Sequence, residues 1–144
     1  MSGWITTYRG TVYPRHLDHM DHMNVQHYVE KFDEAVWHLF ASVGLTPGYM
    51  RERNRGMAAV EMNIKYKREL HAGDLVVVRS GILAVTEKSL RLAHEMTNGA
   101  TGEVAALQEA VAVHLDRAAR RAVPLPEEIA ARARACIVAP PEDP

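Results

Sequence analysis

Hydrophobic residues recur at three- and four-residue intervals between positions 25 and 43, which is the spacing of one face of an α-helix. Asn24, before this run, is a residue type that caps helix N-termini, and Gly44, after it, is a type that ends helices in a left-handed turn. The pattern predicts one long helix over residues 25–43, and Pro47 is expected to prevent it from resuming. The apolar members are Tyr28, Val29, Phe32, Ala35, Val36, Leu39, Phe40 and Val43.

Alternation of apolar and polar residues predicts β-strands in most of the remaining chain. The clearest case is residues 60–67, where Val60, Met62, Ile64 and Tyr66 share one face. Further strands are predicted over residues 5–13, 75–85, 90–96 and 103–116. A short helix is predicted over residues 127–135, because acidic residues occupy its first turn and arginines its last.

This order of elements predicts an α+β fold, with an antiparallel sheet of about five strands wrapped around one long central helix and a short C-terminal helix. A length of 144 residues with 47% hydrophobic residues suits one core and is too short for two, so residues 1–138 are expected to form a single domain. Residues 139–144 are expected to form a flexible tail. Because one helix cannot cover the whole sheet, some surface is expected to be buried against a second copy of the chain.

Charge and composition exclude several classes of protein. The formal net charge of -1 provides no large positive field for binding nucleic acid. Cys136 is the only cysteine, which excludes an intramolecular disulfide and a cysteine-cluster metal site. The sequence shows neither a signal peptide nor an apolar run of membrane-spanning length. We therefore expect a cytoplasmic protein with no nucleic-acid or membrane partner.

The densest group of polar residues, positions 16–24, lies just before the predicted long helix, where unpaired backbone N–H groups create a positive electrostatic end. Asp18 and Asp21 place two carboxylates there, and the like charge is expected to raise the pKa of one of them. The neighbouring imidazoles suggest a metal site, but their spacing matches no recognised ligand motif, so we expect no metal. These imidazoles belong to His16, His19, His22 and His27.

The sequence Asp18-His19-Met20-Asp21-His22-Met23-Asn24, followed by Tyr28-Val29-Glu30-Lys31-Phe32-Asp33-Glu34-Ala35, resembles the signature of the hotdog-fold acyl-CoA thioesterases of the 4-hydroxybenzoyl-CoA thioesterase type. The resemblance extends over about residues 8–126. There are two departures: His16 stands where many relatives have an aspartate, and Asp21 stands where glycine is usual. Aspartate tolerates a left-handed backbone better than most residues, so we expect the turn at Asp21 to be kept.

The resemblance implies that the protein hydrolyses an acyl-CoA thioester to a free acid and CoA. Such a reaction needs a nucleophile or base and a donor that stabilises the oxyanion. By resemblance these are Asp18, as nucleophile or general base, and the backbone amide of Val25. His22, Asn24 and Tyr28 are implied to bind substrate, although Asn24 also fits a role as helix cap alone, and Tyr28 fits the core. No cofactor is implied, since coenzyme A is part of the substrate, and the site is expected at a subunit interface of a homodimer or homotetramer.

Other functions remain open at this point. A hotdog hydroxyacyl-thioester dehydratase would pair His22 or His27 with Glu34, and a non-catalytic module would bind acyl-CoA without hydrolysing it. The acyl group is undetermined between short aliphatic, aryl and betaine-like groups. His94 is expected to be a hydrogen-bonded core residue. Candidates for binding the CoA phosphates are the cations Lys65, Lys67, Arg68, Arg91, Arg117, Arg120 and Arg121.

Overall fold

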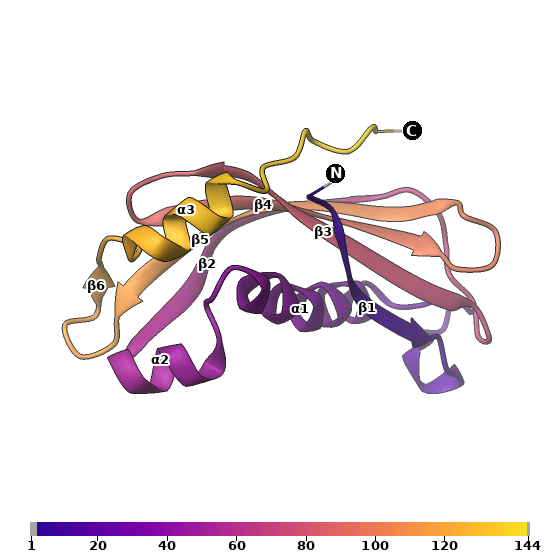
Figure 1. Cartoon of the computed structure of the whole chain (residues 1–144). Coiled ribbons are helices and arrows are strands. Elements are labelled where there is room, and N and C mark those ends of the chain that lie inside the picture. The colour runs from indigo at the N-terminus through magenta and orange to yellow at the C-terminus, as the bar shows by residue number, and fades with distance from the viewer. Residues whose placement is uncertain (1–2, 144) are drawn as a thin grey trace.

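Helix α1 (Val25–Ser42) lies against the concave face of a curled antiparallel sheet in the computed structural model, which describes residues 3–143 (Figure 1). The predicted α+β architecture, with one helix inside the sheet, is confirmed. The strands follow one another across the sheet in the order β1 (Ile5–Thr11), β3 (Leu75–Val85), β4 (Ser89–Asn98), β5 (Val104–Asp116) and β2 (Arg55–Tyr66), and β6 (Arg121–Ala122) pairs with β5.

The core forms between the apolar face of α1 and the inward side chains of the sheet. Phe32 is buried at the centre of this contact and stacks on His94 of β4, with ring centroids 5.5 Å apart. Leu39 lies further along the helix and packs in a second cluster with Leu90 and Leu92. The apolar side chains at three- and four-residue spacing on α1 therefore pack against the inward-facing, alternating side chains of the strands.

A second helix, α2 (Pro47–Arg53), follows α1 and was not expected from the sequence. The side chain of Thr46 accepts a hydrogen bond from Tyr49 N at 3.1 Å, which caps this helix. Gly44 has the predicted left-handed conformation, with φ 101. Pro47 does stop α1 from resuming, but proline is also well suited to the first position of a helix, where its missing N–H is not needed.

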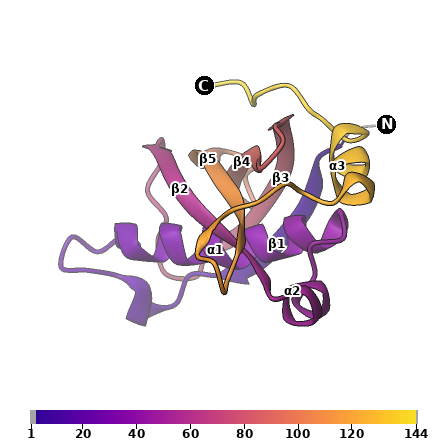
Figure 2. The same ribbon diagram turned by 90° about the vertical axis from the view of Figure 1, so that its left-hand side faces the viewer.

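The remaining helices are short. The 3-10 helix η1 (Pro14–His16) leads from β1 into the polar loop, and α3 (Glu127–Arg134) matches the predicted C-terminal helix. Figure 2 shows α1 crossing beneath the sheet and α3 at its side. Within residues 3–143, none of the helices has the length and apolar character needed to cross a membrane.

Candidate functional site

The loop before α1 is folded into a tight hairpin-like turn. Leu17 and Met23 form an isolated antiparallel bridge, inside which Asp18 N donates to His22 O at 3.2 Å. Asp21 N donates to Asp18 O at 3.0 Å, and Asp21 has φ 63. The expected left-handed turn at Asp21 is therefore confirmed, and it holds Asp18 close to the N-terminus of α1.

Both carboxylate oxygens of Asp18 accept hydrogen bonds. Asn24 Nδ2 donates to Asp18 Oδ2 at 2.9 Å, and Met20 N donates to Asp18 Oδ1 at 2.8 Å. These two donors, Asn24 first, lower the pKa of Asp18 below its ordinary value. Asp18 is therefore not the aspartate whose pKa the like charge was expected to raise, and its carboxylate is ionised at neutral pH.

Three of the four backbone amides around the start of α1 donate hydrogen bonds within the protein. Asn24 N donates to His16 O, Gln26 N donates to the capping Oδ1 of Asn24, and His27 N donates to Asn24 O, each at 3.0 Å. The Val25 amide between them has no acceptor among the residues that the structure describes. An unpaired N–H at a helix N-terminus is a donor directed at an incoming anionic oxygen.

A pocket of about 200 Å³ opens at the N-terminal end of α1 and is lined in part by Val25. It contains three of the five site residues expected from the sequence, His22, Val25 and Tyr28, while Asp18 and Asn24 lie next to it in the loop. Its complete lining is His22, Met23, Val25, Tyr28, Tyr66, Lys67, Arg68 and Glu69. The structure thus brings the predicted residues to one end of α1.

Tyr28 belongs to both the core and the pocket. Its side chain is buried, and its hydroxyl donates to Arg68 O at 3.1 Å. Burial raises the pKa of Tyr28 to about 12, so the phenol stays protonated at neutral pH. Its ring meets that of Tyr66 edge to face, with centroids 5.1 Å apart. Tyr28 therefore forms a rigid, uncharged side of the pocket.

Glu69 is the pocket residue that the sequence did not indicate. Its Oε1 lies 3.8 Å from Nε2 of His22. The two residues are far apart in the sequence, so no local pattern indicates this contact. Of the seven cations considered for CoA phosphates, Lys67 and Arg68 lie in this pocket. Arg117 and Arg120 line a different cavity near the start of β2.

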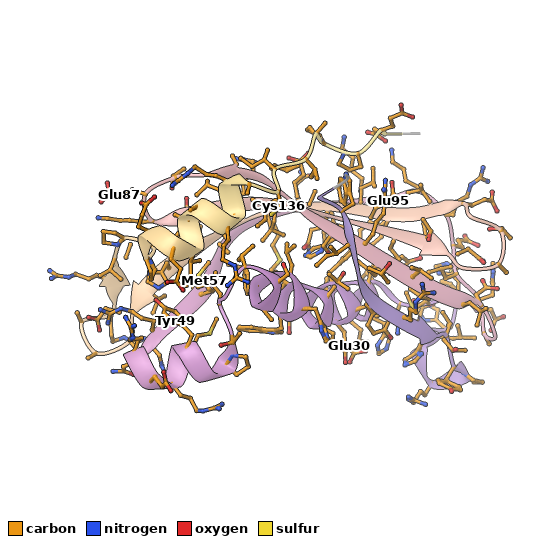
Figure 3. All side chains as sticks on the ribbon, in the orientation of Figure 1. Glu30, Tyr49, Met57, Glu87, Glu95 and Cys136 are labelled. Carbon is orange, nitrogen blue, oxygen red and sulfur yellow. The ribbon has the colours of Figure 1, made fainter. Side chains whose placement is uncertain are left out.

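A second polar cluster lies on the β1 side of α1, where His16, His27 and Glu30 place potential ligand atoms within 4.8 Å of one another. Figure 3 shows Glu30 on this part of α1. His16 Nδ1 accepts a hydrogen bond from Tyr13 N at 2.9 Å, so the proton of the neutral ring resides on Nε2. Binding a metal ion through Nε2 would require the loss of that proton, so the hydrogen bond from Tyr13 disfavours His16 as a ligand.

The same cluster bears on the dehydratase alternative. Nδ1 of His27 lies 3.3 Å from Oε1 of Glu30, whereas Glu34 makes no ion pair or hydrogen bond with either His22 or His27 among the described side chains. The histidine–acid pair considered for a dehydratase is therefore not formed.

Lys31 is a further unexpected feature. Its side chain is only 2% exposed, and Nζ donates to Tyr8 Oη at 2.9 Å. The sequence carried a signal for this burial, because Lys31 lies three residues after Tyr28 and four before Ala35, on the apolar face of the helix.

Comparison with known proteins identifies the family to which the chain belongs. A model described as the thioesterase-like superfamily matches residues 12–133. The chain is 27% identical over 135 residues to a betainyl-CoA thioesterase of Pseudomonas aeruginosa, which covers 94% of this chain and 85% of that protein.

Solved structures agree with the fold. A thioesterase from Thermus thermophilus, complexed with coenzyme A and Zn, is 30% identical with a TM-score of 0.79, covering 94% of this chain and 96% of that one. A Staphylococcus aureus protein in complex with CoA is 23% identical with a TM-score of 0.86, covering 97% of this chain and 89% of that one. The predicted hotdog architecture is confirmed.

Proposed function

Because the chain belongs to the thioesterase-like superfamily, we propose that it hydrolyses an acyl-CoA thioester to a free acid and coenzyme A. One observation carries the proposal: the Asp18 carboxylate is hydrogen-bonded to Asn24, the residue that directly precedes the unpaired amide of Val25. A donor for the oxyanion and a group that attacks or activates water are the two requirements of thioester hydrolysis.

The Val25 amide is proposed to bind the thioester carbonyl oxygen. Negative charge develops on this oxygen when the carbonyl carbon becomes tetrahedral, and the partial positive charge at the N-terminus of α1 stabilises it further. Removing one such donor typically costs about 10²–10³ in kcat.

Asp18 can act by two routes. As a nucleophile it attacks the carbonyl carbon, the C–S bond breaks with departure of the CoA thiolate, and water then hydrolyses the resulting mixed anhydride. As a general base it takes a proton from the attacking water. Both routes use the ionised carboxylate, and the lowered pKa of Asp18 keeps it in that form at neutral pH.

The experiment that tests the proposal is a free-thiol release assay with short aliphatic, aryl and betainyl-CoA thioesters, comparing wild type with Asp18→Asn. We expect wild-type turnover and a loss of at least about 10²-fold in the variant, in the range of removing a group that acts on the reacting centre. Asp21→Asn is the matched control, since it removes a neighbouring carboxylate. If Asp18→Asn retains most activity, the role of Asp18 is wrong; binding of CoA without any turnover would favour the non-catalytic module.

The pocket supports a short acyl group. Its volume of about 200 Å³ lies below the range of roughly 300–1,000 Å³ common for sites that hold whole drug-sized ligands. The Tyr28 and Tyr66 rings and the Glu69 carboxylate are groups that also attract a quaternary ammonium. Betainyl-CoA, the substrate in the name of the Pseudomonas relative, is therefore a leading member of the substrate panel.

We also propose that a second copy of the chain covers the free edge of β2 and that the site lies near this interface. Among residues 3–143, β2 pairs only with β5, and its exposed apolar side chains include Val60, which is 63% exposed, and the half-exposed Met62 and Tyr66. Tyr66 is part of the pocket. Sedimentation analysis should show a dimer or tetramer that Val60→Lys weakens; a wild-type monomer at all concentrations would contradict this. The cytoplasmic location remains a prediction.

A further inference from the structure

We propose that Lys65 and Lys67 form a phosphate-binding site for coenzyme A, and that Asp143 occupies this site in the ligand-free protein, so that residues 139–143 compete with the substrate. This inference rests on the proposed function, because it assigns the phosphate end of the same ligand. It selects two of the seven cations that the sequence offered.

Two ammonium groups converge on one carboxylate at this position. Lys65 Nζ lies 2.8 Å from Asp143 Oδ2, and Lys67 Nζ contacts the other oxygen, Asp143 Oδ1. The two lysines stand two residues apart in the sequence, so their charges repel when no anion lies between them. A phosphate group has more charge and more acceptor oxygens than a carboxylate, and both lysines can donate to it at once.

Lys67 connects this anion site to the candidate active site. It lines the same pocket as Val25, and together with Arg68 it also lines a second cavity of about 430 Å³. The other residues of that cavity are Gly102, Glu103 and Val104. In the proposed binding mode, a ligand with its thioester at Val25 extends past Lys67, and its phosphates lie between Lys65 and Lys67.

The segment that carries Asp143 is weakly held. Val138 N donates to Ile82 O at 2.9 Å, but no backbone hydrogen bond is made by residues 139–143 within the described part of the chain. The segment leaves α3 and runs along the outside of the sheet (Figure 1). The Asp143 side chain is 41% exposed, and ion pairs at such exposure contribute little because water and salt screen them. A phosphate ligand can therefore displace it.

The test is calorimetric binding of coenzyme A to the full chain and to Asp143→Asn. We expect the variant to bind coenzyme A roughly two- to fivefold more tightly, the range of a weak surface ion pair. Glu142→Gln removes the same charge from the neighbouring residue, which makes no ion pair among the described residues, and should leave the affinity unchanged. Pantetheine, which lacks the phosphates, should bind all variants equally.

A second pair of variants tests the lysines. Lys65→Gln combined with Lys67→Gln should weaken binding of coenzyme A, leave pantetheine binding unchanged, and abolish the gain from Asp143→Asn. Equal affinity of Asp143→Asn and Glu142→Gln for coenzyme A would overturn the competition, and an unchanged affinity in the double lysine variant would overturn the site. These measurements need no turnover. If no acyl-CoA is hydrolysed but the affinities shift as stated, the proposed function fails while the anion site stands.

Discussion

Asn24 donates from Nδ2 to Oδ2 of Asp18 at 2.9 Å, while its Oδ1 accepts from Gln26 N at 3.0 Å. One side chain therefore caps α1 and orients the carboxylate beside it. The cap fixes where the helix begins, and thus where the Val25 amide points. The hydrogen bond to Asp18 fixes the carboxylate relative to that amide.

The two roles of Asn24 can be separated by substitution. Asn24→Ala removes both and should lower the free energy of unfolding by about 1 kcal/mol, the usual cost of losing a cap. Asn24→Ser keeps a capping oxygen, but its shorter side chain has no amide Nδ2 to donate to Asp18, so it should retain most of the stability and still lose activity. Urea unfolding and thiol-release kinetics measure the two effects.

The same variants make a prediction about pH. The pKa of Asp18 is lowered chiefly by Asn24, so wild-type kcat/KM should persist to pH values below the ordinary range for aspartate and fall only when the carboxylate is protonated. Without the Asn24 donor the pKa of Asp18 rises, and the acid limb of the profile should move to higher pH. An Asn24→Ser profile identical to that of wild type would show that this contact does not act on the reacting carboxylate.

The oxyanion donor can be deleted without a large change to the helix. Val25 is the first residue of α1, where proline is favoured and its missing N–H leaves no helical bond unmade. Asn24 before it has φ -69 and ψ 149, the extended conformation that a residue before proline prefers. Val25→Pro should therefore fold normally and lose about 10²–10³ in kcat.

Val25→Ala is the control, because it trims the same side chain and keeps the amide. We expect it to retain near wild-type kcat. Circular dichroism and unfolding curves establish that both variants are folded. Full activity in folded Val25→Pro would exclude this amide as the oxyanion donor.

Most of the fold was predictable because its signals are local. The three- and four-residue spacing after Asn24 defined α1, and strict alternation in residues 60–67 defined the end of β2. Helix α2 was missed because Pro47 was predicted only to stop a helix. Proline is also favoured at the first position of a helix, and Thr46 before it caps α2.

The candidate site was predictable where its residues are close in sequence. Asp18 and Asn24 lie within one loop, and the family signature places them together. Contacts between residues far apart in the sequence are not indicated by any local pattern. His22 meets Glu69 only through the fold, and Lys65 meets Asp143 across 78 positions. Side-chain contacts between distant segments depend on how the sheet curls, which a periodic pattern does not specify.

Acid should destabilise the protein through its buried histidines. His94 is fully buried, its Nδ1 lies 2.5 Å from Ser80 Oγ, and its Nε2 has no hydrogen-bond partner among residues 3–143. The core role expected for His94 is thus confirmed. Burial lowers the pKa of His94 from 6.5 to about 3, and it also lowers the pKa of His114.

As pH falls below 6.5, His94 therefore becomes protonated in the unfolded chain while it stays neutral in the folded state. The stability is fully present above that pH and declines towards about pH 3, by up to about 1.4 kcal/mol per pH unit for a group such as His94. Urea unfolding at several pH values measures this slope. His94→Gln should flatten it, whereas His38→Gln, at an exposed position of α1, should not. An equal slope in wild type and His94→Gln would assign the acid sensitivity to other groups.

Lys31 is expected to limit stability. Its ammonium is buried with one neutral partner, Tyr8, and without an ion pair among the described residues, so desolvation of the charge is poorly offset. Lys31→Met keeps the chain length and removes the charge, and should leave the free energy of unfolding unchanged or raise it by about 1–3 kcal/mol. Tyr8→Phe leaves the ammonium without its acceptor and should lower it by about 1–3 kcal/mol. In the double variant the effect of Tyr8→Phe should largely vanish, because no buried charge remains to be satisfied. A large loss of stability in Lys31→Met would instead mean that the lysine makes a net favourable contribution to the fold.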